Sequence, residues 1–250
     1  MAESKRSGGR GPEELRAYEI VRDFTEFAAG SVLISMGRTK VLCTASIDRE
    51  VPRWMAGTGR GWVTAEYSLL PGSSAERVSR EAVKGRQSGR TQEIQRLIGR
   101  SLRSICDLES LGERQVILDC DVLQADGGTR TAAITGAYVA LHDACRTLVE
   151  QHELEVLPFR DSVAAVSVGI VDGNLLLDLD YEEDARAEVD MNVVMTGRAR
   201  FVEIQGTAER APFSRDELDR LVEVASAGIA RLADAQRTSI AAATSRRSTR

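Results

Sequence analysis

The stretch from Asp119 to Ala137, DCDVLQADGGTRTAAITGA, constrains the fold of this chain more than any other. It contains most of an apolar run, Val116 to Leu123, that is short and rich in β-branched residues, which is typical of a strand buried on both faces. Gly127 and Gly128 then allow the backbone to turn sharply. The apolar residues that follow recur with the period of a helix: Ile134, Ala137, Tyr138, Leu141, Cys145 and Leu148. The stretch therefore predicts a strand, a glycine turn and a helix, in that order.

Such an order is typical of a phosphate site. The unpaired N–H groups and the positive end of the helix dipole lie beside a backbone that an anion can approach closely, and Arg130 is adjacent. A second interpretation is open at this point. In it, the glycines only form a tight turn, Thr129 or Thr131 caps the helix, and the Arg130 side chain is solvated. A second anion contact elsewhere in the chain would favour the phosphate site.

The composition is that of a globular protein. Of the 250 residues, 42% are hydrophobic and 28% are charged, which excludes a disordered or fibrous chain and allows one large domain or two small ones. No apolar run approaches the ~20 residues of a membrane span, and the first residues have no apolar signal segment, so we expect a cytoplasmic protein without membrane contact. We expect a flexible arm over residues 1–12, one catalytic domain over 13–240 and a disordered basic tail over 241–250.

Cysteine and histidine are too sparse for several common kinds of site. The four cysteines are far apart in apolar segments and form no C-x-x-C pair, so they are predicted to be reduced core residues. The only histidines, His142 and His152, lie in or just after one predicted helix. A histidine-based nucleophilic triad and a multi-histidine metal site are therefore disfavoured.

A local excess of basic residues stands against the overall net charge of −5. Residues 77–103 include two acidic residues and eight basic ones: Arg77, Arg80, Lys84, Arg86, Arg90, Arg96, Arg100 and Arg103. A basic patch on an acidic body can steer a polyanion such as RNA to one place. Aromatic residues make up only 4% of the chain, so such binding would contact phosphates rather than bases. These arginines are also compatible with a solvated surface, or with salt bridges at a subunit contact.

The predicted elements indicate an α+β fold with mixed sheets. Hairpins are expected over residues 31–46 and 163–179, the second with an Asp172-Gly173 turn, and strands over 62–68, 191–196 and 201–204. Residues 72–89 lack apolar periodicity and are predicted to form a mobile loop. Helices follow over 91–108 and from Ser214, where Glu217 completes a capping box. Hairpins and helices without regular alternation favour α+β over α/β.

Two further segments could complete a site with the glycine turn. Arg90 stands at a second glycine-preceded helix start, so its guanidinium could converge with that of Arg130 on one phosphate. The acidic run from Asp178 to Asp190 crowds carboxylates between two predicted strands. Crowded carboxylates are costly unless a cation neutralises them, and Mg²⁺ prefers such oxygen ligands. A solvated acidic loop is the other interpretation of this run.

Five segments of the chain resemble, in family order, the bacterial ribonuclease PH family: GWVTAEYSLLPGSSAER (61–77), GRQSGRTQEIQRLIGRSLR (85–103), DCDVLQADGGTRTAAITGA (119–137), YEEDARAEVDMNVVMT (181–196) and VEIQGTAERAPFSRDEL (202–218). The resemblance runs from about Glu14 to the end of the last helix. It implies the ribosomal protein S5 domain 2-like α+β fold, with mixed β-sheets and packed helices. It also implies a phosphate-dependent 3′ exoribonuclease, or tRNA nucleotidyltransferase, that trims precursor tRNA and other RNA, releases nucleoside diphosphates and forms a homohexamer built as a trimer of dimers.

The resemblance also assigns roles to individual residues. Inorganic phosphate, the co-substrate, is implied to bind Arg90, Gly128, Thr129 and Arg130. The acidic pair Asp184 and Asp190 is implied to hold Mg²⁺ and to act in catalysis. RNA is implied to bind the arginine-rich loop, and the neighbouring helix is a further candidate, so the RNA-binding residues expected are Arg77, Arg80, Arg86, Arg96 and Arg100.

Two rival functions make distinct predictions. A catalytically silent, RNA-binding ring subunit of an exosome-like assembly would lack the arginine pair or the acidic pair, and this chain has both. A hydrolytic nuclease would release nucleoside monophosphates whether or not phosphate is present. Phosphorolysis needs no histidine base, because inorganic phosphate is already ionised near neutral pH, and this agrees with the scarcity of histidine.

Overall fold

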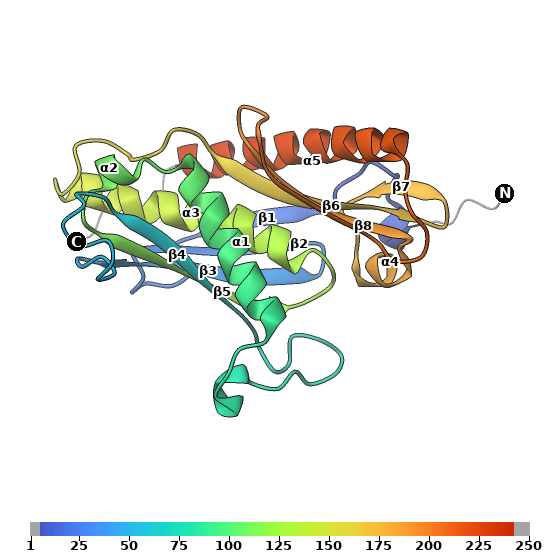
Figure 1. The fold of residues 1–250 in the computed structure, drawn as a ribbon, viewed down its shortest axis with the longest axis horizontal. Coiled ribbons are helices and arrows are strands. Elements are labelled where there is room, and N and C mark those ends of the chain that lie inside the picture. The colour runs from blue at the N-terminus through green and yellow to red at the C-terminus, as the bar shows by residue number, and fades with distance from the viewer. Residues whose placement is uncertain (1–5, 243–250) are drawn as a thin grey trace.

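Two β-sheets form the framework of the chain, whose computed structural model describes residues 6–242 (Figure 1). The first sheet has the order β1 (Tyr18–Arg22), β2 (Gly30–Met36), β3 (Thr39–Asp48), β5 (Gln115–Gln124) and β4 (Trp62–Leu69). Only β4 and β5 are parallel in it. The second sheet is antiparallel, with the order β7 (Asn174–Leu177), β6 (Val163–Val171), β8 (Val189–Thr196) and β9 (Phe201–Ala208).

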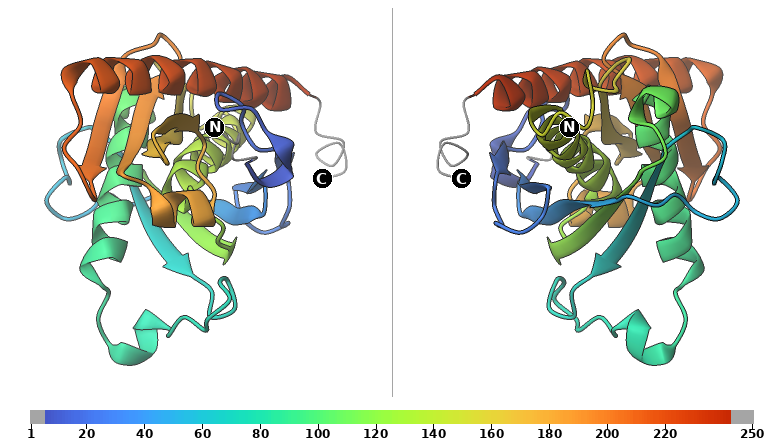
Figure 2. Two further views of the ribbon diagram at one scale, coloured as in Figure 1. Left: turned by 90° about the vertical axis from the view of Figure 1, so that its right-hand side faces the viewer. Right: turned by 90° about the vertical axis from the view of Figure 1, so that its left-hand side faces the viewer.

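Three long helices cover these sheets. Helix α3 (Thr129–Glu150) packs against β2 and β3 on one side and β6 on the other, so it lies between the two sheets (Figures 1 and 2). Helix α1 (Gly89–Ile105) packs on β4, and α5 (Arg215–Ala241) packs on β6. The short helices are α2 (Leu108–Leu111), α4 (Tyr181–Arg186) and the 3-10 turns η1 (Ser7–Gly9) and η2 (Glu81–Lys84). None of the helices within residues 6–242 is long and apolar enough to span a membrane.

A single cluster of buried apolar side chains joins both sheets to α3. It includes Ile34 of β2, Leu118 of β5, Leu141 of α3 and Val166 of β6, all without exposed surface. The expected hairpins are present as β2–β3 and β6–β7, and the second turns through Asp172 and Gly173, both at positive φ. The α+β prediction is confirmed.

Helix α5 begins as its capping box predicts, with Ser214 accepting from the Glu217 backbone and Glu217 accepting from that of Ser214. The cysteine prediction also holds, because all four thiols are free and buried. Helix α1 begins two residues earlier than expected, because Ser88 caps it by accepting from the Thr91 N–H. The loop over 72–89 contains η2 and is otherwise irregular, and it projects beyond the end of α1 (Figure 1). Its mobility stays a prediction.

The prediction that the central strand is buried on both faces was wrong. Burial alternates along β5: Val116, Leu118, Cys120 and Val122 are buried, whereas the residues between them are partly exposed. Helices α1 and α3 cover only one face of this sheet, so the other face keeps contact with water. An apolar run shows that a strand is buried but does not show how many layers cover it.

The described part of the expected flexible arm is packed rather than loose. Arg6 is only 7% exposed. Its guanidinium donates to both carboxylate oxygens of Glu183, at 2.8 and 2.9 Å, and to the Leu177 carbonyl at 2.7 Å. This ion pair holds residues 6–12 against β7 and α4, a contact that polar composition could not predict. Residues 1–5 lie outside the described residues, as do residues 243–250 of the expected tail.

Candidate active site

The glycine turn between β5 and α3 forms the centre of the candidate site. Gly127 and Gly128 have φ of 76° and 63°, a region that favours glycine. A β-carbon on Gly127 would lie 2.5 Å from the Leu179 carbonyl oxygen, so only glycine allows this close approach. Gly128 is the N-cap of α3 and supplies no side-chain acceptor, which leaves N–H groups of the first turn free of a side-chain cap.

Neither threonine of the first turn caps α3, contrary to the second interpretation of the sequence. The Thr129 hydroxyl accepts from the Tyr67 hydroxyl at 2.8 Å, and the Thr131 hydroxyl donates to the Gly128 carbonyl at 2.9 Å. Thr129 and Thr131 are both buried. The threonines therefore fix the turn from within and leave the helix N-terminus without a side-chain cap, an arrangement that favours binding of an anion.

Arg130 is held rather than freely solvated. Its Nη1 donates to Gln205 Oε1 at 2.6 Å and lies 3.4 Å from Glu93 Oε1, and its side chain is 14% exposed. Arg90 is exposed in the first turn of α1. The positive charges of both arginines oppose the rise that burial causes in the pKa of two carboxyls, those of Asp184 and Asp190. Two guanidiniums from different helices thus act on one region.

The acidic pair faces these arginines from α4 and β8. Burial raises the pKa of Asp190 to about 6, and the neighbouring negative charge of Asp184 adds to this shift while Arg130 opposes it. Loss of water around the Asp184 carboxyl raises its pKa as well, with Arg90 and Arg130 opposing the shift. The charge of Asp184 thus disfavours ionisation of Asp190, and a cation bound by these carboxyls would relieve that repulsion.

Helix α4 gives the acidic run a structure that the sequence analysis did not predict. Asp180 caps it by accepting from the Glu183 N–H at 2.9 Å, and Glu183 accepts from the Asp180 N–H at 3.1 Å. This segment is therefore a helix rather than a loop, although Glu182 and Asp184 are exposed on it. The D-x-x-E spacing was the available signal for it.

The carboxylates of Asp184 and Asp190 suit Mg²⁺ better than a cation whose ligands all come from the protein. Within residues 6–242, no group of three or more histidine, cysteine or acidic side chains is arranged to hold a metal ion. Mg²⁺ commonly binds one or two carboxylates and fills its other positions with water and substrate phosphate oxygens. Asp184 and Asp190, beside an open helix N-terminus, fit that pattern.

The expected RNA-binding arginines fall into two groups. Arg77, Arg80 and Arg86 are exposed on the projecting loop, and Arg96 is exposed on α1. Arg100 on α1 instead forms an ion pair and hydrogen bond with Glu203 of β9. The loop arginines are therefore the better placed to meet an RNA backbone, and part of the α1 charge serves contacts within the chain.

Arg103, the last basic residue of the patch, has an intrachain role. Its guanidinium lies 4.2 Å from the ring centre of Trp62 and donates to the Val63 carbonyl at 2.7 Å. Both contacts fasten α1 to β4. The interpretation of these helix arginines as an RNA surface is thus not supported at Arg103.

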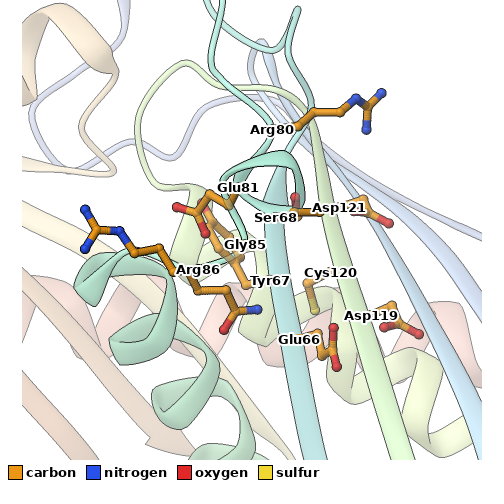
Figure 3. A pocket seen from close by; sticks show the side chains of 12 residues that line it. Glu66, Tyr67, Ser68, Arg80, Glu81, Gly85, Arg86, Asp119, Cys120 and Asp121 are labelled. Carbon is orange, nitrogen blue, oxygen red and sulfur yellow. The ribbon is translucent and has the colours of Figure 1, made fainter.

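A separate cleft of 540 Å³ lies between the projecting loop and the open face of the first sheet (Figure 3). Its floor includes the carboxylates of Glu66, Asp119 and Asp121, and Arg80 and Arg86 stand at its edge. Burial raises the pKa of both aspartates, and the Glu66 charge adds to the shift at Asp119. An acidic floor repels phosphate, so this cleft is distinct from the candidate phosphate site, none of whose residues lines it.

Sequence reasoning missed four residues around the site. Tyr67 bonds to Thr129, Gln205 and Glu93 hold Arg130, and the Glu209 charge raises the pKa values of both site aspartates. Glu93 could have been found, because it lies one turn after Arg90 on the same helix. The other three come from strand β4 and from β9 and its end, far away in sequence, and no local pattern connects them to the turn.

Comparisons with known proteins give the chain its family. Residues 14–146 match the model of domain 1 of the 3′ exoribonuclease family, and residues 161–228 match that of domain 2. A ribonuclease PH from Synechococcus sp. (strain CC9605) is 59% identical over 232 residues, which cover 93% of each chain.

Solved structures agree on the fold. A chain of the Archaeoglobus fulgidus exosome with RNA bound to the active site superposes with a TM-score of 0.79 at 23% identity, covering 93% of this chain and 92% of that one. Rice (Oryza sativa) Rrp46 superposes with a TM-score of 0.76 at 19% identity, covering 94% and 100%. At such identities the likeness shows the fold alone, which is the ribosomal protein S5 domain 2-like fold. With both domain models and a relative of 59% identity, the chain belongs to the ribonuclease PH family of 3′ exoribonucleases.

Proposed function

We propose that this chain, a phosphorolytic 3′–5′ exoribonuclease, performs its reaction where α3, α4 and β8 meet. Inorganic phosphate would bind Arg90, the Gly128–Thr129 backbone and Arg130, and the RNA 3′ end would lie between that phosphate and the acidic pair. The observation that carries the proposal is the convergence of charges. Arg90 and Arg130 shift the pKa of both Asp184 and Asp190, although these four residues come from four different elements.

The arginines and the helix N-terminus would position the nucleophile. A phosphate oxygen attacks the last phosphodiester, the bond from phosphorus to the 3′ oxygen breaks, and a nucleoside diphosphate leaves. Because the phosphate is already ionised, the protein supplies orientation and charge stabilisation rather than a base. Gln205 and Glu93 hold the Arg130 guanidinium in place before phosphate arrives, which reduces the ordering cost of binding.

Asp184 and Asp190 would hold Mg²⁺, which when bound offsets the negative charge that develops on the phosphoryl oxygens. The shortened RNA also needs a proton on its new 3′ oxygen. Asp190 would supply this proton at a moment when no cation is bound to it, because in the cation-free protein burial raises its pKa to about 6, close to neutral pH. A carboxyl cannot hold the cation and that proton on the same oxygen, so the two roles belong to different moments or different oxygens.

The RNA would be bound through its backbone by Arg77, Arg80, Arg86 and Arg96, which are exposed, with Arg100 contributing only if its pair with Glu203 opens. We propose precursor tRNAs in the cytoplasm as the main substrates, other RNA with free 3′ ends as further ones, and the reverse nucleotidyl transfer as a second activity. We also propose a homohexamer built as a trimer of dimers. The 59% identity to a ribonuclease PH supports these assignments.

One assay separates this function from its rivals. The protein is incubated with a 3′-extended tRNA, Mg²⁺ and radiolabelled phosphate, and the products are separated by chromatography. Phosphorolysis places the label in nucleoside diphosphates. Unlabelled monophosphates would indicate hydrolysis instead, and binding of tRNA without any nucleotide release would indicate a silent ring subunit.

A further inference from the structure

We propose that Arg16 is a positioning residue for the phosphate site, which it serves by fixing the peptide groups of the glycine turn. The inference rests on the proposed function, because it requires phosphate to bind at Gly128, Thr129 and Arg130. Arg16 lies between β7 and the turn, more than a hundred residues before the turn in sequence, and its side chain is only 5% exposed.

Arg16 and Thr39 donate hydrogen bonds to successive carbonyl groups of the turn. Arg16 Nη1 donates to the Asp126 carbonyl at 2.5 Å, and Nη2 lies 3.4 Å from the Gly127 carbonyl. The Thr39 hydroxyl donates to the same Gly127 carbonyl at 2.6 Å and accepts from the Asp126 N–H at 2.9 Å. Both donor side chains are buried.

These contacts determine where the turn's N–H groups point. In a planar trans peptide the C=O and the following N–H face opposite directions. Holding the carbonyls of Asp126 and Gly127 on the Arg16 side therefore turns the N–H groups of Gly127 and Gly128 to the other side. Glycine pairs can rotate such peptide groups at little cost, so this turn needs an external restraint to present its N–H groups to an anion.

Asp178 anchors the guanidinium. It is fully buried and accepts three hydrogen bonds from Arg16: from the backbone N–H at 2.8 Å, from Nε at 3.0 Å and from Nη2 at 2.7 Å. Asp178 has a positive φ of 56°, in the left-handed region that aspartate tolerates better than most residues other than glycine. Two residues later, Asp180 caps α4, which bears Asp184. The same guanidinium thus ties the phosphate turn to the start of the acidic helix.

The planar guanidinium of arginine, with several N–H groups in fixed directions, is necessary to position the turn. Arg16 reaches both Asp178 oxygens while its remaining N–H groups reach the turn, a set of directions that the single ammonium of lysine cannot reproduce. Arg16→Lys would keep the buried positive charge and lose the hydrogen bond to the Asp126 carbonyl. This variant therefore separates the effect of the charge from the effect of positioning the turn.

The chain supplies a matched control in a second buried arginine–aspartate pair. Arg22 of β1 pairs with Asp143 of α3, with side-chain exposures of 5% and 0%, the same as those of Arg16 and Asp178. Arg22 also donates to backbone carbonyls, but these belong to Ser239 and Ile240 at the end of α5. Arg22→Lys should therefore cost a similar amount of stability without touching the turn.

The test compares Arg16→Lys with Arg22→Lys by two measurements. One is the KM for inorganic phosphate in phosphorolysis at saturating RNA. The other, which needs no activity, is the rise in Tm on adding inorganic phosphate. We expect Arg16→Lys to raise the phosphate KM about tenfold and to reduce the Tm rise, with the KM for RNA unchanged. Arg22→Lys should lower the starting Tm but keep the wild-type phosphate KM.

Equal phosphate KM values in the two variants would overturn the inference. If Arg16→Lys does not fold, Thr39→Val and Thr39→Ser are compared instead, because of these two only serine keeps the hydroxyl that bonds to the Gly127 carbonyl. Equal phosphate KM values for these two variants would also overturn the inference. Arg130→Ala distinguishes failure of the proposed phosphate site from failure of the Arg16 positioning role. If Arg130→Ala leaves the phosphate KM and the Tm rise unchanged, the proposed site itself is wrong. If it weakens both while the Arg16 and Thr39 variants do not, only the positioning role fails.

Discussion

Gly127 packs directly on the backbone of Asp180, so that a β-carbon at 127 would lie 2.6 Å from the Asp180 carbonyl carbon. Asp180 is the N-cap of α4, and Gly127 precedes the N-cap of α3. The helix that offers N–H groups to phosphate and the helix that bears Asp184 therefore begin at one point of contact. Because the two helix starts touch, a change in either start is expected to affect both anion binding and the acidic pair.

Gly127→Ala should damage the enzyme more than an equivalent change at another glycine turn. The substitution forces a side chain into a positive φ of 76° and into the Leu179 and Asp180 backbone. Gly173→Ala is the matched control, because its φ is 72° but no atom lies within 4 Å of the added carbon. We expect a loss of about 1–3 kcal/mol in the free energy of unfolding for Gly173→Ala and a larger loss for Gly127→Ala. Only Gly127→Ala should also raise the phosphate KM. Urea unfolding and phosphorolysis kinetics measure these effects, and equal losses for the two would contradict the packing argument.

Arg130→Ala should lower turnover about a hundredfold or more. Removing one preorganised electrostatic contact to a transition state typically costs ~2.7–4 kcal/mol of barrier. The fold should survive, because the Arg130 contacts to Gln205 and Glu93 are polar and lie near the surface. Diphosphate release at saturating phosphate tests this, with Arg146→Ala towards the other end of α3 as the control, since Arg146 forms a surface ion pair with Glu150. Near-wild-type turnover of Arg130→Ala would remove it from the site.

The parts of the site that were predictable are contiguous in sequence. The strand, turn and helix around Gly128 depend on neighbouring residues, and the Asp172-Gly173 hairpin and the Ser214 capping box are equally local. Arg90 and the acidic run could also be selected, because each has a local signal of its own. No local signal showed that these segments belong to one enzyme. Only their resemblance, as whole segments, to a known family indicated it.

The features that could not be predicted from the sequence depend on which elements pack together. Asp178 looks like one acid among several in a polar run, yet it is fully buried, because Arg16 pairs with it across 162 residues of sequence. Arg6 has the same relation to Glu183. The open face of β5 could not be predicted either, since an apolar run does not reveal whether a second layer covers it. Long-range pairing leaves no periodic trace in a single sequence.

Asp190 should make the cation-free protein lose stability as the pH rises from about 4 to about 6. Its pKa is about 6 in the folded chain against 3.8 as the ordinary value, so within this window the folded state holds a proton that the unfolded state has released. Stability falls with rising pH wherever the folded state binds more protons. The free energy of unfolding of wild type minus that of Asp190→Asn should therefore decrease across this window and level off above it. Urea titrations without Mg²⁺ measure the difference, and a constant value over the window would show that the Asp190 pKa is not raised.

Replacing Arg77, Arg80 and Arg86 together with alanine should weaken RNA binding without changing the phosphate KM. These side chains are exposed on the projecting loop, and none of them belongs to the proposed phosphate-binding set. Each lost phosphate contact reduces the dependence of log K on log salt by about 0.7–0.9, so the slope should fall by about 2 to 3. Arg100→Ala is the control, because its guanidinium already pairs with Glu203 and its loss should change the slope little. Filter binding of a 3′-extended tRNA over a range of salt concentrations measures both variants. An unchanged slope in the triple variant would show that the RNA follows another surface.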